Sequence, residues 1–286
     1  MSCFTRHMSR KKIALDLLVV KRGLAADRNA AQRLILSGKI YTTNSLLDKP
    51  GVSVAEDLEI FIEEPEHPYV SRGGVKLAYA LDTWRINPTG WICGDFGAST
   101  GGFTDCLLQR GVSRVYAYDV GRGLIHWKLR QDSRVILREG INIRHLKTFD
   151  IPEPLDLLAI DLSFISLVRI WPIARLFLKA EGIIVALVKP QFEVPKGRVG
   201  KGGIVRCPSD RRLVLERHFE SCRENQLAVV DIQRSPIPGT EGNLEYLSLI
   251  VLPDECRNWR NRLNLSVDDH LSVSRIEQLA EESVGP

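Results

Sequence analysis

A glycine-rich stretch, GDFGASTGGF at residues 94–103, directly follows an apolar run that has the character of a buried strand. Glycine clusters mark places where the backbone approaches something closely, and in α/β sheets ligands bind where the first strand turns into its helix. We therefore expect a binding loop made of Gly97, Ala98, Ser99, Thr100, Gly101 and Gly102. The alternative is a tight turn with close helix packing.

A carboxylate follows at a distance typical of a nucleoside site. Asp119 ends the apolar run YAYD, 22 positions after Gly97, and an acid about 20 residues beyond such a loop binds ribose hydroxyls. The loop matches neither the dinucleotide fingerprint nor a Walker loop, which argues against a diphosphate. This combination favours S-adenosylmethionine, with Asn142 as a further candidate near the adenine. A strand-end cap is the alternative for Asp119.

Three more charged residues stand at the ends of apolar runs. Asp161 closes LDLLAID, Lys189 closes IIVALVK, and Glu245 opens LEYLSLIVL. If the last of these strands runs antiparallel to the others, all three residues lie near the glycine loop. A lysine placed beside a bound cofactor can accept or redirect a proton. The alternatives are a lysine that extends to the surface, and carboxylates that serve as caps or ion-pair partners.

The elements that must position these residues alternate along the chain from residue 73. The strand candidates are WICGDFG, RVYAYDVG, RVILREG, LDLLAIDLSF, GIIVALVKPQF, LAVVDIQRSPI and LEYLSLIVL, with helix candidates between most of them. Continuous apolar strands separated by helices predict an α/β fold: a Rossmann-like, mostly parallel sheet that is buried on both faces, with the last strand antiparallel.

A basic module precedes this sheet. Residues 11–23 and 27–38 predict two short helices, with Asp27 as a cap, and KIYTTN and LEIFIEE predict strands. Residues 1–40 contain nine lysines and arginines and two acids, a net charge of +7 that indicates a polyanionic partner. The candidate RNA contacts there are Lys11, Lys12, Arg22, Arg28, Arg33 and Lys39.

A second basic segment, PKGRVGKGGIVR at residues 195–206, contributes Lys196, Arg198, Lys201 and Arg206 as candidate phosphate contacts. The alternative for both basic regions is an ordinary solvated surface.

The composition excludes several other classes. The 286 residues are 44% hydrophobic, and no run approaches the roughly 20 apolar residues of a membrane helix. The six cysteines are scattered without zinc-ligand spacing, so we expect no metal and reduced thiols, as in the cytoplasm.

Several longer segments together resemble the TlyA (hemolysin A) family, whose catalytic domain is similar to the FtsJ ribose 2′-O-methyltransferases. The matching segments are VSRGGVKL (70–77), GASTGGFTD (97–105), VYAYDVG (115–121), DLSFISL (161–167), LVKPQFE (187–193), GKGGIVR (200–206) and SPIPGTEGNLEY (235–246). The basic module resembles the ribosomal-protein-S-four-type RNA-binding domain, although Asp27 and TTN depart from the usual pattern there.

This resemblance implies a catalytic tetrad of Lys76, Asp161, Lys189 and Glu245 and methyl transfer from S-adenosylmethionine to a cytidine 2′-hydroxyl of ribosomal RNA. It also implies an RNA-binding domain at residues 1–64, a linker at 65–72, a methyltransferase domain at 73–255 and a tail at 256–286. A non-catalytic RNA-binding or ribosome-assembly factor built on the same scaffold is the competing interpretation.

Overall fold

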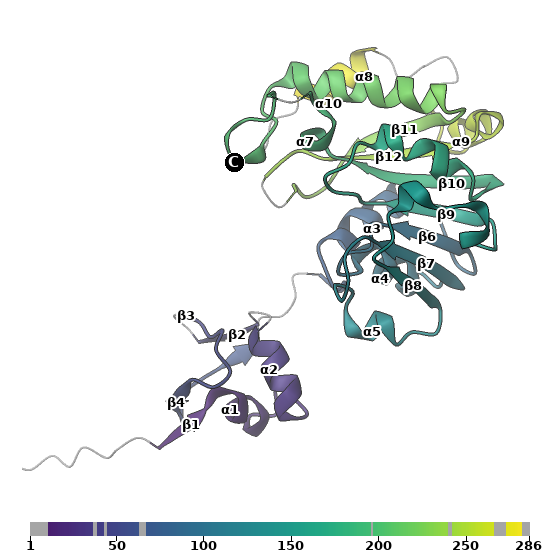
Figure 1. Ribbon diagram of the computed structural model, residues 1–286. Coiled ribbons are helices and arrows are strands. Elements are labelled where there is room, and N and C mark those ends of the chain that lie inside the picture. The colour runs from purple at the N-terminus through teal and green to yellow at the C-terminus, as the bar shows by residue number, and fades with distance from the viewer. Residues whose placement is uncertain are drawn as a thin grey trace, which may run out of the picture. The chain divides into compact units, whose positions relative to one another are not determined.

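The computed structural model of the chain describes residues 11–36, 39–42, 45–62, 67–195, 197–239, 242–265 and 273–281. It divides into two compact units, residues 1–68 and residues 69–286, which are labelled by element in Figure 1. Each unit has its own hydrophobic core, so each is described by itself.

The small unit combines short helices and short strands. Its elements are β1 (Lys12–Ala14), α1 (Leu15–Lys21), α2 (Arg28–Leu36), β2 (Ile40–Thr42), β3 (Ser45–Leu46), β4 (Ser53–Ala55) and β5 (Phe61–Ile62). The Asp27 carboxylate accepts a hydrogen bond of 2.7 Å from the Ala30 amide, which confirms the predicted cap of α2. Residues 12–14 were expected to be helical, because the amphipathic pattern extends beyond the N-terminal end of α1. They instead pair with residues 53–55 as antiparallel strands.

The large unit is built on a seven-stranded sheet. Its strands are β6 (Ile92–Phe96), β7 (Arg114–Asp119), β8 (Val135–Glu139), β9 (Leu155–Ile160), β10 (Leu178–Val188), β11 (Ala228–Arg234) and β12 (Tyr246–Val251), in the order β11-β12-β10-β9-β6-β7-β8. The pairs among β10, β9, β6, β7 and β8 are parallel, whereas β12 runs antiparallel to both of its neighbours. The predicted sheet and the predicted direction of its last strand are thus confirmed.

Helices cover both faces of this sheet. They are α3 (Gly73–Thr83), α4 (Gly102–Gln109), α5 (Trp127–Arg130), α6 (Trp171–Arg175), α7 (Pro190–Glu193), α8 (Pro208–Glu224), α9 (Cys256–Arg262) and α10 (Val273–Glu281). Buried side chains of α3, α4, α5 and α9 form one core with one face of the strands, which we call the α3 face. Side chains of α6, α8 and α10 form the other core with the opposite face.

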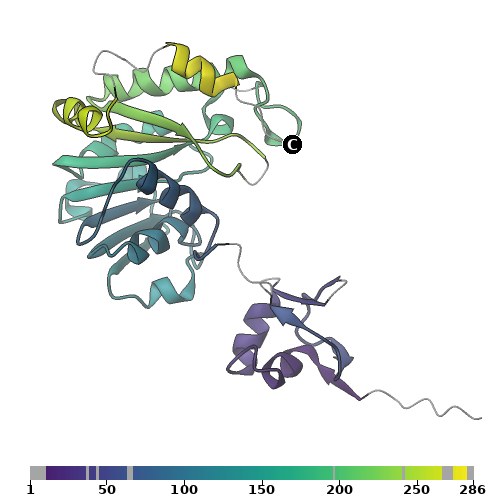
Figure 2. The ribbon, with the colours of Figure 1, turned by 180° about the vertical axis from the view of Figure 1, so that it is seen from behind.

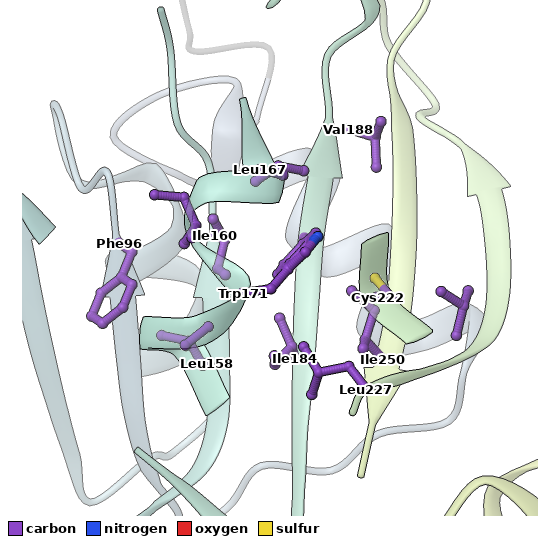
Figure 3. Close-up of a cluster of buried hydrophobic side chains, with 14 of the residues drawn as sticks. Phe96, Leu158, Ile160, Leu167, Trp171, Ile184, Val188, Cys222, Leu227 and Ile250 are labelled. Atoms are coloured by element: carbon purple, nitrogen blue, oxygen red, sulfur yellow. The ribbon is translucent and has the colours of Figure 1, made fainter. Parts of the chain in front are cut away.

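Trp171 of α6 is fully buried in this second core, close to Leu158, Ile160 and Ile184 from the strands, as Figure 3 shows. Helix α10 packs along α8, which can be followed in the view from behind in Figure 2. None of the described helices is long and apolar enough to cross a membrane.

Two helical segments differ from the sequence expectation. Helix α3 was not predicted, because its first turn begins with two glycines and it lies directly after an irregular segment. Conversely, the helix expected over residues 167–182 is short: α6 ends at Arg175, and β10 already begins at Leu178. The large unit begins at Tyr69, and the Val70 amide donates a hydrogen bond to the buried Asp105 carboxylate.

Candidate active site

Five charged residues at strand ends project from the α3 face of the sheet. Side chains alternate between the faces of a strand, so a residue two positions from an α3-face residue points the same way. Asp95, Asp119, Asp161, Lys189 and Glu245 follow this rule. Their neighbours two positions away are the buried α3-face residues Cys93, Ala117, Ala159, Leu187 and Leu247. The alternation and the strand directions therefore gather these groups at one edge and on one side.

Lys76 and Glu245 form a buried ion pair. Helix α3 supplies Lys76, and Glu245 directly precedes β12. Only 9% of the Lys76 side chain and 3% of the Glu245 side chain are exposed. Each charge therefore depends on the other for the interactions that water would otherwise supply.

Lys189 and Asp161 form the second pair. The Lys189 Nζ lies 2.6 Å from Asp161 Oδ1 and donates a hydrogen bond of 3.1 Å to the Ser163 hydroxyl. Because Val188 pairs with Tyr246 across β10 and β12, Lys189 and Glu245 follow at neighbouring positions. The Gln191 amide also lies 3.5 Å from Glu245 Oε1. The structure thus brings all four predicted tetrad residues together as two adjacent pairs.

The glycine loop connects β6 to α4 through strained backbone. Gly97 and Gly101 have positive φ angles of 91° and 98°, and Ser99 has 48°. A Cβ on Gly97 would overlap the Asp161 carbonyl oxygen, and one on Gly101 would overlap the Leu129 side chain. Ala98 is buried while Thr100 is exposed, and Gly102 begins α4 beside Ser71. The loop therefore requires glycine at these positions and lies directly against the tetrad.

Asp119 binds the loop from the neighbouring strand. Its carboxylate accepts hydrogen bonds of 2.8 Å from the Ser99 amide and 2.6 Å from the Gly121 amide. Each oxygen has a second lone pair that can accept from a hydroxyl. Asn142 lies at the same edge, since the preceding Ile141 amide donates to the Asp119 carbonyl, and its side chain caps the turn at Arg144.

Asp95 is a buried carboxyl without a cation partner among the described residues. One oxygen accepts from the Thr104 amide and hydroxyl, and the other has no hydrogen-bond partner. Burial raises the pKa of Asp95 to about 7, and the nearby charges of Asp161 and Asp119 add to this effect. The site thus contains four carboxyl groups, two lysines and an unsatisfied acceptor, a balance that fits a ligand with positive charge.

Phe164 was not among the predicted site residues. Its side chain is 90% exposed although it is aromatic, its φ of 63° is rare for a bulky residue, and its ring lies 5.0 Å from that of Phe192. It directly follows Ser163, which contacts Lys189. The sequence signal was a phenylalanine flanked by serines in SFIS, two residues after the strand-end Asp161.

The six predicted RNA contacts of the small unit are all exposed: Lys11, Lys12, Arg22, Arg28, Arg33 and Lys39. Some also interact within the unit. Lys11 lies 3.7 Å from Glu56, Arg22 donates to the Glu56 carbonyl, and Arg28 pairs with the buried Asp16 at 2.8 Å. Arg33 and Lys39 are exposed on or just after α2, which leaves their charges directed to solvent.

The basic segment at 195–206 is attached to the tetrad region. The Val205 amide donates to the Asn243 side chain, and the Asn243 amide donates to the Gly203 carbonyl. Asn243 lies two residues before Glu245. Arg198, Lys201 and Arg206 are exposed, with Arg198 paired to Asp210; Lys196 lies outside the described residues.

A groove of about 710 Å³ lies at the opposite end of the sheet, between α8, β11 and α9. Its lining includes Phe219, Leu227, Val229 and Pro253, and it contains none of the predicted site residues. Its position at the amino ends of the parallel strands separates it from the candidate active site.

Comparison with known proteins identifies relatives over most of the chain. Residues 69–250 match the family described as FtsJ-like methyltransferase. A provisionally named rRNA methyltransferase of Bacillus subtilis, YqxC, is 42% identical over 249 residues, covering 87% of this chain and 89% of the relative. The 16S/23S rRNA (cytidine-2′-O)-methyltransferase TlyA of Mycobacterium tuberculosis is 40% identical over 237 residues, covering 82% and 88%.

A solved structure of a provisionally named hemolysin from Streptococcus thermophilus is also similar. It is 36% identical, has a TM-score of 0.69, and the match covers 95% of this chain and 96% of that one.

Proposed function

We propose that this chain, which belongs to the FtsJ-like methyltransferase family, methylates the 2′-hydroxyl of a cytidine in ribosomal RNA with S-adenosylmethionine as the methyl donor. The observation that carries the proposal is the pairing of Lys189 with Asp161 and of Lys76 with Glu245 beside the glycine loop. The TlyA relative, whose name states this activity, supports it.

The residues present fit S-adenosylmethionine, which when bound supplies a methyl group on a positively charged sulfonium. The glycines let the backbone of the loop run close beside Asp161, in a conformation that side chains would block, and the Asp119 carboxylate can accept from ribose hydroxyls. The unsatisfied Asp95 oxygen lies at the end of β6 and favours a cationic ligand. Asn142 lies at the same edge, on the side of Asp119, where we place the adenine.

Lys189 is the residue that we assign to proton transfer. A ribose hydroxyl is a weak nucleophile at neutral pH, and a positioned base contributes about 10²–10⁴ in rate. In its amine form, Lys189 accepts the hydroxyl proton, and the ammonium that results is the form that pairs with Asp161 and donates to Ser163. Since only 12% of the Lys189 side chain is exposed, water competes little for this proton.

Lys76 and Glu245 orient the site from its buried side. Their pairing fixes the residue before β12 against α3. The side-chain amide of Gln191, which lies two residues after Lys189, approaches Glu245 and so links this pair to the segment that carries Lys189. Precise placement of the reacting oxygen is itself a large contribution to rate, because it removes the entropic cost of alignment.

Phe164 provides a surface for the target base. Proteins that modify or read single nucleotides stack unpaired bases on exposed aromatic rings, and each stack contributes about 1–3 kcal/mol. The exposed Phe164 ring, supported by Phe192, is adjacent to the Lys189 contact at Ser163. A cytosine on this ring would bring its own ribose toward Lys189.

The two basic regions supply the phosphate contacts. Exposed lysines and arginines position RNA without reading its sequence, and their contribution falls steeply with salt. We assign the phosphate contacts to the basic module, which we propose to be an RNA-binding domain of the ribosomal-protein-S-four type, and to the segment at residues 195–206. We propose the cytoplasm as the site of the reaction, because ribosomal RNA is its proposed substrate.

The test is incubation with labelled S-adenosylmethionine and separately purified, unmodified small and large ribosomal subunits, followed by mapping of ribose methylation. We expect the label at a cytidine 2′-oxygen in one or both subunits. Binding to subunits without any transfer of label would instead support a non-catalytic assembly factor. Label on a base nitrogen or carbon would contradict the proposed chemistry.

A further inference from the structure

Two segments that follow adjacent strands are joined along their length. Residues 161–167 come after β9, and residues 189–193 come after β10. The ion pair of Lys189 with Asp161 joins them at the strand ends. The Phe192 ring lies 5.0 Å from that of Phe164, with an angle of 49° between the rings. The contact furthest from the strands is made by Glu193.

Glu193 uses both of its carboxylate oxygens in this contact. Oε2 accepts a hydrogen bond of 2.6 Å from the Ser166 hydroxyl, and Oε1 accepts one of 2.8 Å from the Leu167 amide. These donors lie two and three residues after Phe164. Burial raises the pKa of the Glu193 carboxyl, while these two hydrogen bonds and the charge of Arg217 act in the opposite direction. An acid is thus kept in a desolvated place, where both of its carboxylate oxygens accept hydrogen bonds from this loop.

Phe164 needs an external constraint. A bulky residue with a positive φ is strained, and such a conformation persists only where the surroundings fix it. An exposed ring also has little packing to keep it in place, and Phe192 is the described ring beside it. On one side of Phe164 the chain is fixed by Asp161 and Ser163, which contact Lys189; on the other side it is fixed by Glu193.

We propose that Glu193 is a positioning residue, whose carboxylate fixes residues 164–167 so that the Phe164 ring receives the target base. This inference rests on the proposed function, since it assigns to Glu193 the placement of a substrate contact. Glu193 itself touches neither the base nor the proton-transfer groups in this scheme. Its loss should therefore act on turnover of RNA and leave S-adenosylmethionine affinity unchanged.

The test compares Glu193→Ala, Glu193→Gln and Phe164→Ala, each with intact ribosomal subunits. A glutamine can accept from the Leu167 amide and donate to the Ser166 hydroxyl, so Glu193→Gln should retain activity within about 3-fold. Glu193→Ala should lower kcat about 10- to 100-fold, the size of effect expected when a contact is misplaced by about 1 Å. Affinity for S-adenosylmethionine, measured by calorimetry, should change less than about 2-fold.

A double-mutant cycle shows whether Glu193 acts through Phe164. If it does, Glu193→Ala combined with Phe164→Ala should be no slower than Phe164→Ala alone. If the two substitutions lower kcat by independent factors that multiply in the double variant, the inference is overturned. A Glu193→Ala variant with wild-type kcat would overturn it as well. Ser166→Ala, which removes one of the two hydrogen bonds, should give a smaller loss than Glu193→Ala and protects the test against a variant that does not fold.

Hydrogen exchange of the Leu167 amide gives a readout that does not depend on activity. Exchange should be faster in Glu193→Ala and return to the wild-type rate in Glu193→Gln, with the exposed α8 variant Glu220→Ala unchanged as the control. Unaltered exchange in Glu193→Ala would contradict the anchoring contact. A wild-type chain that methylates no RNA would contradict the proposed function, whereas an active wild type with an insensitive Glu193 would contradict this inference.

Discussion

The two lysine–carboxylate pairs of the site differ in burial although their chemistry is the same. The difference lies in the carboxylates, since 3% of the Glu245 side chain but 22% of the Asp161 side chain is exposed, whereas the two lysines are similar at 9% and 12%. The open pair adjoins the exposed ring of Phe164, and the buried pair joins α3 to β12. Identical charges therefore serve two purposes: one pair can meet a substrate, and the other fixes the elements around it.

The largest difference should appear in activity when Lys189 is replaced. Lys189→Ala removes the proposed proton acceptor, so we expect methyl transfer to fall by at least about 10²–10⁴, with S-adenosylmethionine affinity largely intact. The measurement is single-turnover methylation together with calorimetry. Lys179→Ala is the matched control, because Lys179 lies at the other end of β10 and also pairs with an aspartate, Asp156. Turnover near the wild-type level would remove Lys189 from its assigned role.

The buried pair should instead dominate stability. Glu245→Ala leaves the Lys76 ammonium buried and unpaired, and breaking such a pair typically costs about 3–5 kcal/mol. Asp161→Ala should cost less, about 1–3 kcal/mol, because the Asp161 side chain is 22% exposed and Lys189 keeps its hydrogen bond to Ser163. Urea unfolding of the two variants measures the contrast. Replacing both Lys76 and Glu245 by apolar residues should restore much of the stability but no activity. Equal losses of unfolding free energy in Glu245→Ala and Asp161→Ala would show that the two pairs do not differ in their contribution to stability.

Most of the arrangement of the site residues could be predicted from the sequence. The strand-end positions of Asp161, Lys189 and Glu245 follow from apolar runs, and their common side follows from the alternation of side chains. The antiparallel direction of β12 was expected and decides that Glu245 joins the others. These features were accessible because burial of both sheet faces leaves a plain apolar pattern in the sequence.

Other parts were not accessible for physical reasons. Lys76 was identified only by resemblance, because α3 begins with glycines and gives no helical signal at its start. Phe164 depends on a backbone strain that no periodicity records. Which carboxylate pairs with which lysine depends on packing between elements far apart in the chain, since 169 residues separate Lys76 from Glu245.

A smaller perturbation can reach the buried pair through packing alone. A Cβ on Gly239 would lie 2.5 Å from Glu245 Oε1, so Gly239→Ala must displace this carboxylate. We expect a loss of about 1–3 kcal/mol, as for overpacking of a core, and a partial loss of kcat. Gly51→Ala, where a new methyl meets nothing within 4 Å, is the steric control. Wild-type stability and kcat in Gly239→Ala would show that the Glu245 position is not critical.

The smallest expected effect concerns Asp95, a buried carboxyl without a lysine partner among the described residues. Its pKa in the folded protein is raised from 3.8 to about 7, so its protonation stabilises the fold at low pH and this contribution is lost as pH rises through about 7. Without cofactor, the protein should lose about 1 kcal/mol of stability between pH 6 and pH 8 through this group. Asp95→Asn should remove that slope in pH-dependent melting; an unchanged slope would assign it to other groups.

The register between β10 and β12, in which Val188 faces Tyr246, has an evolutionary consequence. The connection between β11 and β12 carries Gly239, Asn243 and Glu245, so a change in its length would displace contacts of the site. A one-residue deletion inside β12 would exchange its two faces and turn Glu245 away from Lys76. Length should therefore be preserved among homologues both in β12 and in the connection that leads into it.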